Sequence, residues 1–216
     1  MIDVNALRPG DIIVSTTNAA VSAVIRAGIG SSVSHSMIYI GGSTVIEAIE
    51  RGVVRRPLAE ALGGAVLAIG LRRRGLTEKQ RADVIKYATQ FMMRPYDKIG
   101  AAGSGTSTGR GGLLASLGCS ISLLFCAAGT AEVVNNAKPT NADRAFFCSE
   151  LVARVFELAG APVVEGSPSF TTPRQVRVAT TLLYLGKLVD TPSPAATALP
   201  MARGGSADGA EGAPGW

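Results

Sequence analysis

The sequence is poor in the residues that mark several large classes of protein. Charged residues make up 17% and aromatic residues 5% of its 216 positions, and it contains only three cysteines and one histidine. Three cysteines are too few, and an odd number, for a small secreted domain held together by disulfides. Apolar residues reach 47%, which excludes a chain that is disordered throughout. The length predicts a single domain, with room for an appendage.

The net charge is positive, but the basic residues lack the pattern of a nucleic-acid-binding protein. The formal charge is +5 and the isoelectric point is about 9.4. The densest basic cluster is Arg72, Arg73 and Arg74, and no aromatic residue lies among them, whereas nucleic-acid-binding surfaces interleave the two. We therefore expect no nucleic-acid partner. We interpret the charge as a solvated basic face, which would equally suit an anionic polymer or a membrane surface.

The N-terminal segment lacks the features of a Sec signal peptide. It reads MIDVNALRPGDIIV, without a basic region followed by a long apolar run. We therefore expect synthesis in the cytoplasm without a Sec signal. The sequence also lacks a glycine-rich phosphate loop between a strand and a helix. We expect no cofactor and no metal ion.

The distribution of turn and apolar residues predicts an α+β domain over residues 1–190, followed by a disordered tail rich in Ala, Gly and Pro over 191–216. Strands are expected at 11–14, 36–40, 44–49, 52–55 and 66–71, and their short connections favour antiparallel pairing. One helix should begin at a cap formed by Thr17 or Asn18. A second should follow the capping box of Thr77 and Gln80 and stop before Pro95. A third should begin at Cys148.

One stretch of 21 residues, 111–131, carries no charge. It is long enough to cross a bilayer, which takes about 20 apolar residues, but Gly, Ser and Thr dilute its apolar content. We expect a buried helix or helical hairpin inserted into the domain, and contact with a membrane is the alternative. Cys119 and Cys126 lie in this stretch without a nearby His or carboxylate. We interpret both as buried apolar side chains.

The remaining cysteine and the single histidine are the candidates for catalysis. Cys148 opens a predicted helix, where free backbone N–H groups and the helix dipole favour a thiolate. His35 stands at the start of a predicted strand, and a thiolate with an imidazole is the minimal pair of a cysteine hydrolase. Glu47 follows His35 by twelve residues, across a Gly-Gly turn, and could orient the imidazole. Glu50 competes for that role, and a purely structural role remains open for each residue.

The order of these residues resembles that of a known family. The motifs are GDII at 10–13, SHSMIY at 34–39, VIEA at 45–48, GVV at 52–54, PYD at 95–97 and FCSELV at 147–152. This order resembles the YiiX/YaeF-like branch of the NlpC superfamily. These are circularly permuted papain-like cysteine peptidases and amidases, and lecithin–retinol acyltransferase-type enzymes share the permuted fold. The resemblance implies an antiparallel sheet packed on helices, with the nucleophile at a helix N-terminus.

The resemblance also implies a role for each candidate. Cys148 is expected to be the nucleophile, His35 the general base and then acid, and Glu47 the residue that orients His35. The backbone N–H of Cys148 is expected to form part of an oxyanion hole. The residues expected to bind substrate are Tyr96, Tyr39 and Ser149. For the two tyrosines, a role in packing remains the alternative.

The leading hypothesis is a cysteine amidase or peptidase that forms an acyl-thioester on Cys148 and cleaves peptidoglycan stem peptides or a related amide. The expected substrate lies in the cell wall, but we expect no Sec signal on the protein. This combination suggests export by a specialised secretion machinery into the periplasm of a target cell. The protein would then be an antibacterial toxin with a cognate immunity protein. Two alternatives stay open. One is a lipid acyltransferase or thioesterase with the same Cys-His pair and residues 111–131 at a membrane. The other is a binding module in which His35 and Cys148 never meet.

Overall fold

The computed structural model describes residues 1–97 and 145–191. The predictions for residues 111–131, including Cys119 and Cys126, and for the tail beyond Thr191 lie outside the described residues. None of the helices among the described residues is long and apolar enough to cross a membrane.

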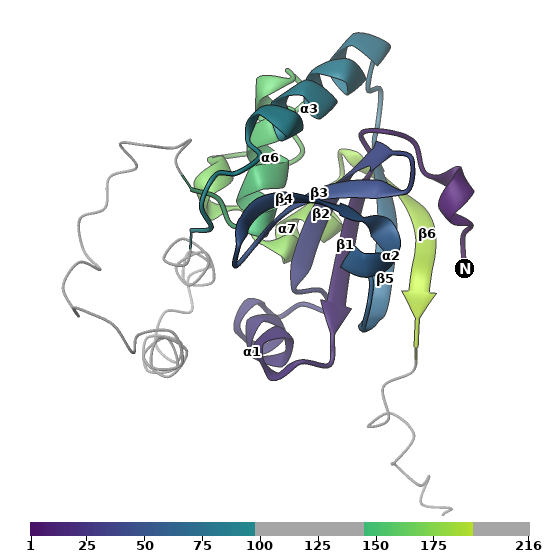
Figure 1. Ribbon diagram of the computed structural model, residues 1–216, viewed down its shortest axis with the longest axis vertical. Helices are drawn as coiled ribbons and strands as arrows, with labels where there is room; N and C mark the ends of the chain where they lie inside the picture. Colours follow the sequence, from purple (N-terminus) through teal and green to yellow (C-terminus); the bar gives the residue numbers. More distant parts are fainter. Residues whose placement is uncertain (98–144, 192–216) are drawn as a thin grey trace, which may run out of the picture.

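A six-stranded antiparallel sheet forms the centre of the molecule (Figure 1), with strand order β4-β3-β2-β1-β5-β6. The strands are β1 (Ile12–Thr17), β2 (His35–Gly41), β3 (Thr44–Ile49), β4 (Gly52–Pro57), β5 (Ala65–Arg73) and β6 (Leu182–Asp190). The first five were predicted from the sequence, with ends that differ by a few residues. The α+β class and the antiparallel pairing are confirmed.

The edge strand β6 was not predicted, because it lacks a regular alternation of apolar and polar residues. Its pairing with β5 shifts register twice, once beside Gly70. Gly186 lies opposite Gly70 with φ of 140°, and a Cβ there would lie 2.3 Å from Cγ2 of Ile2. Glycine is therefore required where the N-terminal segment crosses the strand. The same glycine interrupts the residue pattern by which a strand is recognised in the sequence.

The helices are α1 (Ala20–Ile29), α2 (Leu58–Ala61), α3 (Glu78–Gln90), α6 (Cys148–Leu158) and α7 (Pro173–Val178), with short 3₁₀ turns η1 (Val4–Ala6) and η2 (Pro168–Phe170). The capping box of α3 is confirmed, since Thr77 and Gln80 bond each other's backbone N–H groups. The predicted cap of α1 is wrong, because Ala19 is the N-cap. Thr17 instead ends β1, paired with Ala65.

Both faces of the sheet are covered by apolar side chains. Along β1, Ile12 and Val14 belong to one apolar cluster and Ile13 to a second, because successive side chains of a strand point to opposite faces. The first cluster takes in the buried side of α6, including Leu151 and Phe156. Helix α6 is thereby fixed against the sheet, and its first residue is held at a defined position.

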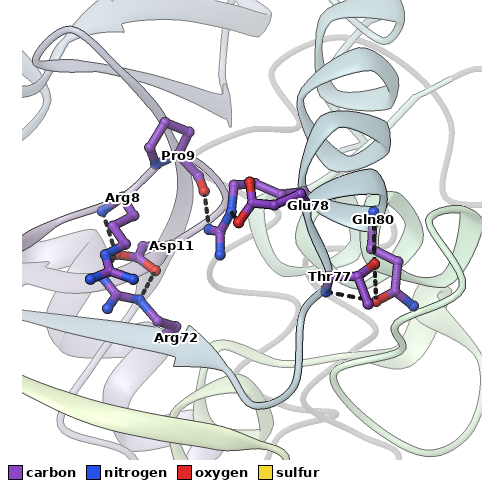
Figure 2. A network of polar contacts seen from close by, with 8 residues as sticks. Arg8, Pro9, Asp11, Arg72, Thr77, Glu78 and Gln80 are labelled. Atoms are coloured by element: carbon purple, nitrogen blue, oxygen red, sulfur yellow. Dashed lines mark hydrogen bonds and ion pairs between the residues drawn. The ribbon is translucent and has the colours of Figure 1, made fainter.

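A buried carboxylate ties the start of β1 to β5, in the network of Figure 2. Asp11 is fully buried and accepts hydrogen bonds from Nε and Nη2 of Arg72, both at 2.7 Å, and from the backbone N–H of Arg8 at 2.7 Å. Nearby, Nη1 of Arg81 on α3 donates to the carbonyl of Pro9 at 2.5 Å. Arg72, expected on a solvated basic face, is thus an internal anchor with 20% of its side chain exposed.

We predict that Asp11→Ala lowers the free energy of unfolding by about 3 kcal/mol, because it leaves a largely buried guanidinium without its partner. Urea unfolding followed by circular dichroism measures the change. The matched control is Asp83→Ala, which removes an i,i+4 pair with the exposed Lys79 and should cost less than about 1 kcal/mol. Equal losses in the two variants would contradict an anchoring role for Asp11.

Candidate active site

The N-terminus of α6 presents Cys148. The preceding Phe146 and Phe147 are buried and non-helical, and the ring of Phe146 packs on Phe91 with centroids 4.6 Å apart. The backbone of Phe146 bonds Pro95 and Asp97 on both sides of Tyr96, at 3.0 Å each. These contacts hold Tyr96 close to the start of the helix. Cys148 is 6% exposed, and the free backbone N–H groups of the first helical turn surround it.

The hairpin of β2 and β3 brings His35 and Glu47 together. Nε2 of His35 lies 2.6 Å from Oε2 of Glu47. The other carboxylate oxygen of Glu47 accepts a hydrogen bond from Nη1 of Arg56 on β4, at 2.9 Å. Glu47 is 1% exposed, so its charge is buried but fully paired. Of the two carboxylates considered from the sequence, Glu47 makes the contact with His35.

His35 also forms a side-chain hydrogen bond with Cys148. Because Glu47 occupies Nε2, the ring nitrogen available to the sulfur is Nδ1. Burial alone would lower the pKa of His35, but the negative charge of Cys148 and the hydrogen bonds to Cys148 and Glu47 raise it to about 10. Burial alone would raise the pKa of the Cys148 thiol, but the His35 imidazolium lowers it below its ordinary value. Both shifts favour a thiolate on Cys148 and an imidazolium on His35.

The same charges keep Glu47 ionised. Burial would raise its pKa, but the hydrogen bond and charge of His35, together with Arg56, lower it below its ordinary value. The carboxylate thus fixes the orientation of the ring and stabilises its protonated form. Arg56 also bonds Glu60 on α2, with Nε 3.1 Å from Oε1, which holds the guanidinium in place beside Glu47.

The three residues expected to bind substrate lie in different surroundings. Tyr96 is half-buried, and its pKa is raised by burial and by the negative charge of Cys148, so its phenol stays protonated near the sulfur. Tyr39 packs in the second apolar cluster, and its hydroxyl accepts a hydrogen bond from the backbone of Ser43 at 3.2 Å. Ser149 is buried and donates to the carbonyl of Thr171 at 2.7 Å. Of the three, Tyr96 is the one whose pKa responds to the charge of Cys148.

Sequence reasoning missed two residues of this site, Ser36 and Arg56. Ser36 is fully buried, and its backbone N–H and hydroxyl face the sulfur of Cys148, where they favour the thiolate. Among the described residues the hydroxyl has no hydrogen-bond partner of normal geometry. A serine inside an apolar strand was the available signal for Ser36. Arg56 could be placed beside Glu47 only from the register of β3 and β4, in which Glu47 pairs with Val54.

The described residues contain no group of three or more His, Cys, Asp or Glu side chains placed to hold a metal ion.

Comparisons with known proteins show related sequences and a shared fold. Residues 6–101 match the family of permuted papain-like amidase enzymes of YaeF and YiiX. The "Probable lipoprotein peptidase YaeF" of Escherichia coli is 27% identical over 173 residues, which are 77% of this chain and 61% of that protein. This chain thus spans about three fifths of the length of that relative. The crystal structure of the metalloprotein yiiX from Escherichia coli shares the fold, with a TM-score of 0.58 and 19% identity, and the match covers 86% of this chain and 98% of that one.

We predict that Cys148 reacts with iodoacetamide at a pH below that at which a free thiol reacts, about 8.5. In His35→Gln the imidazolium is lost while burial remains, so the midpoint of the pH profile should move above about 8.5. Mass spectrometry of peptides alkylated at a series of pH values gives the profile, with Cys119 and Cys126 as internal references. Equal, slow labelling of all three cysteines would contradict an activated thiol.

We predict that Glu47→Gln lowers kcat by at least about a hundredfold, because the neutral amide no longer stabilises the imidazolium or fixes the ring. The midpoint of Cys148 alkylation should move to higher pH as well, since a less stable imidazolium lowers the pKa of the thiol less. The control is Glu60→Gln, which removes an exposed carboxylate from the same Arg56 without touching His35. Similar pH profiles for the two variants would exclude the role of Glu47.

Proposed function

We propose that this chain, which is similar to YaeF and YiiX and shares the permuted papain-like fold, is a cysteine hydrolase that cleaves an amide bond. One observation carries the proposal. The sole histidine of the sequence is hydrogen-bonded to a helix-start cysteine and to a buried carboxylate at 2.6 Å. This arrangement supports the roles of nucleophile, base and orienting group for Cys148, His35 and Glu47.

In the first half of the reaction, the Cys148 thiolate attacks the carbonyl carbon of the amide and forms a tetrahedral oxyanion. The His35 imidazolium then gives its proton to the nitrogen of the leaving amine. The C–N bond breaks, the oxyanion collapses, and an acyl-thioester remains on Cys148. Because the proton already resides on His35 in the resting pair, the attacking group needs no separate deprotonation.

In the second half, neutral His35 takes a proton from a water molecule, and the resulting hydroxide attacks the thioester carbonyl. The C–S bond breaks, the carboxylic acid product leaves, and the proton returns to the Cys148–His35 pair. Glu47 stays ionised in both halves of the reaction and stabilises His35 whenever its ring is protonated. Its buried pairing with Arg56 supports that constant charge.

The oxyanion of each tetrahedral intermediate needs hydrogen-bond donors. Backbone N–H groups at the start of α6 provide them, and the positive end of the helix dipole adds to their effect. We propose the phenol of Tyr96, whose pKa is raised by burial and by the negative charge of Cys148, as a further donor. Removing one such donor typically costs about 2.7–4 kcal/mol in the transition state.

The substrate we propose is the peptide part of peptidoglycan. The family description as amidase and the name of the relative as a peptidase support amide chemistry, and the net charge of +5 suits an anionic wall polymer. We further propose that the protein acts in the periplasm of a target cell as an antibacterial effector. Export by a specialised secretion machinery and a cognate immunity protein are part of that proposal.

We predict that the wild-type protein releases new amine and carboxyl ends from purified peptidoglycan, with the mass of one water added for each cleaved bond. The Cys148→Ala variant should release none, because it lacks the nucleophile and retains the helix. Liquid chromatography with mass spectrometry of the soluble fragments measures both.

A parallel incubation with phospholipid vesicles tests the acyltransferase or thioesterase alternative. Release or transfer of acyl chains by the wild type, without cleavage of peptidoglycan, would replace the amidase proposal with the lipid enzyme. Identical behaviour of wild type and Cys148→Ala in both assays would exclude catalysis by this thiol and leave the binding module.

A further inference from the structure

A depression of about 640 Å³ opens at the end of the sheet that carries His35. Its floor includes Thr16 near the end of β1, Leu67 near the start of β5 and Lys187 on β6. Residue Ser15 of β1 pairs with His35, so these strand ends and the start of β2 lie at the same edge. The volume is within the range of about 300–1,000 Å³ found for small-molecule sites.

Three cationic side chains and one carboxylate line this depression. The cations are Arg26, Arg177 and Lys187, and the carboxylate is Asp190. Asp190 is already bound to Lys187 at 2.8 Å. Asp190 raises the pKa of Lys187, and Arg177 lies near enough for its charge to oppose that shift. The depression thus holds an excess of positive charge.

The two arginines are held in place by neutral groups. Nη1 of Arg26 donates to Oγ1 of Thr16 at 2.6 Å and to the carbonyl of Thr17 at 2.7 Å. Nη1 of Arg177 donates to the hydroxyl of Ser32. Neither arginine forms an ion pair with the described part of the chain. A guanidinium carries five N–H donors, so each retains donors that the described residues do not use.

Both arginines are connected to the catalytic pair through short chains of contacts. Thr16, which binds Arg26, shares a hydrogen bond of 2.9 Å with Ser34, the neighbour of His35. Arg177 belongs to α7, which begins directly after Thr171 and Thr172. Thr171 accepts the hydrogen bond of Ser149, the neighbour of Cys148. The depression is therefore linked to the sequence neighbours of His35 and Cys148 through these contacts, although its lining residues lie on other elements.

We propose that this depression binds an anionic group, a carboxylate or a phosphate, on the substrate that Cys148 attacks. The proposal rests on the proposed function, which it extends by naming a charged feature of the substrate. Guanidinium groups bind carboxylate and phosphate through paired N–H donors. Arg26 and Arg177 approach from different helices and supply such donors, while Lys187 adds a point charge.

Binding without catalysis tests the site on its own. The full-length Cys148→Ala protein is titrated with glutarate and, separately, with inorganic phosphate, and binding is followed by calorimetry. We expect saturable binding of one or both anions, weakened about ten- to a hundredfold in a Cys148→Ala protein that also carries Arg177→Gln. The matched control is Arg55→Gln, which removes the same charge from an exposed position on β4. Absence of binding, or an equal loss with Arg55→Gln, would overturn the proposal.

Kinetics then show whether the site serves the reaction. Three amide substrates are compared that differ only in a terminal carboxylate, phosphate or neutral carboxamide. We expect the wild type to prefer an anionic substrate over the carboxamide about ten- to a hundredfold in kcat/KM, mainly through KM, and Arg177→Gln to reduce this preference to about one. The preferred anion distinguishes a peptide carboxylate from a polymer phosphate.

The two proposals fail in different ways. Hydrolysis of all three substrates with equal kcat/KM would overturn the anionic subsite and leave the cysteine hydrolase standing. Saturable, Arg177-dependent binding by a protein that hydrolyses no amide would support an anion site and overturn the hydrolase. Since Arg26 also fastens the end of β1, the variants Arg177→Gln and Lys187→Gln carry the test without disturbing that strand.

Discussion

The hydrogen bond between Glu47 and His35 is the interaction on which the site depends. At 2.6 Å it occupies Nε2, so that the ring can offer only Nδ1 to Cys148, and it favours the protonated ring that holds the thiolate. The bond exists because β2 and β3 form a tight hairpin. Its carboxylate is 1% exposed, and a buried charge of this kind is tolerated only when it is paired. Arg56 supplies the second partner, so a residue on β4 is as necessary to the pair as the hairpin itself.

Packing of apolar side chains positions the nucleophile, whereas hydrogen bonds position His35. Helix α6 buries one side in the apolar cluster between the sheet and α3, while Phe146 fixes the chain just before it through Pro95 and Asp97. Asp11 and Arg72 join β1 to β5 at the end of β1 that lies away from His35. The sheet and the helix are thus fixed independently of the catalytic contacts. Cys148 and His35 meet because the sheet and α6 are held together by other contacts. Little conformational entropy is therefore lost when the two side chains come together.

Local signals in the sequence were sufficient for most of this arrangement. The Gly41-Gly42 turn and the apolar runs on both sides predicted the hairpin, and the spacing of His35 and Glu47 then followed from its geometry. Cys148 was recognisable because the apolar periodicity of α6 begins with it. Features that depend on register or on contacts distant in sequence were not predictable. Arg56 required the exact alignment of β3 and β4, and Ser36 required the docking of α6. Strand β6 required Gly186 to make room for Ile2, which only the folded chain reveals.

The positive charge of the sequence divides into two groups once the partners of the arginines are known. Arg56 and Arg72 are bound to buried carboxylates, and Arg81 to a backbone carbonyl. These arginines therefore connect strands to one another and to α3. Among the described residues, Arg26 and Arg177 are bound only by neutral oxygens, and both line one depression. Net charge alone therefore says little about the substrate, because an arginine with a buried anionic partner contributes little field outside the protein. The informative quantity is the charge that remains unpaired, and in the described chain part of it collects in the depression lined by Arg26 and Arg177.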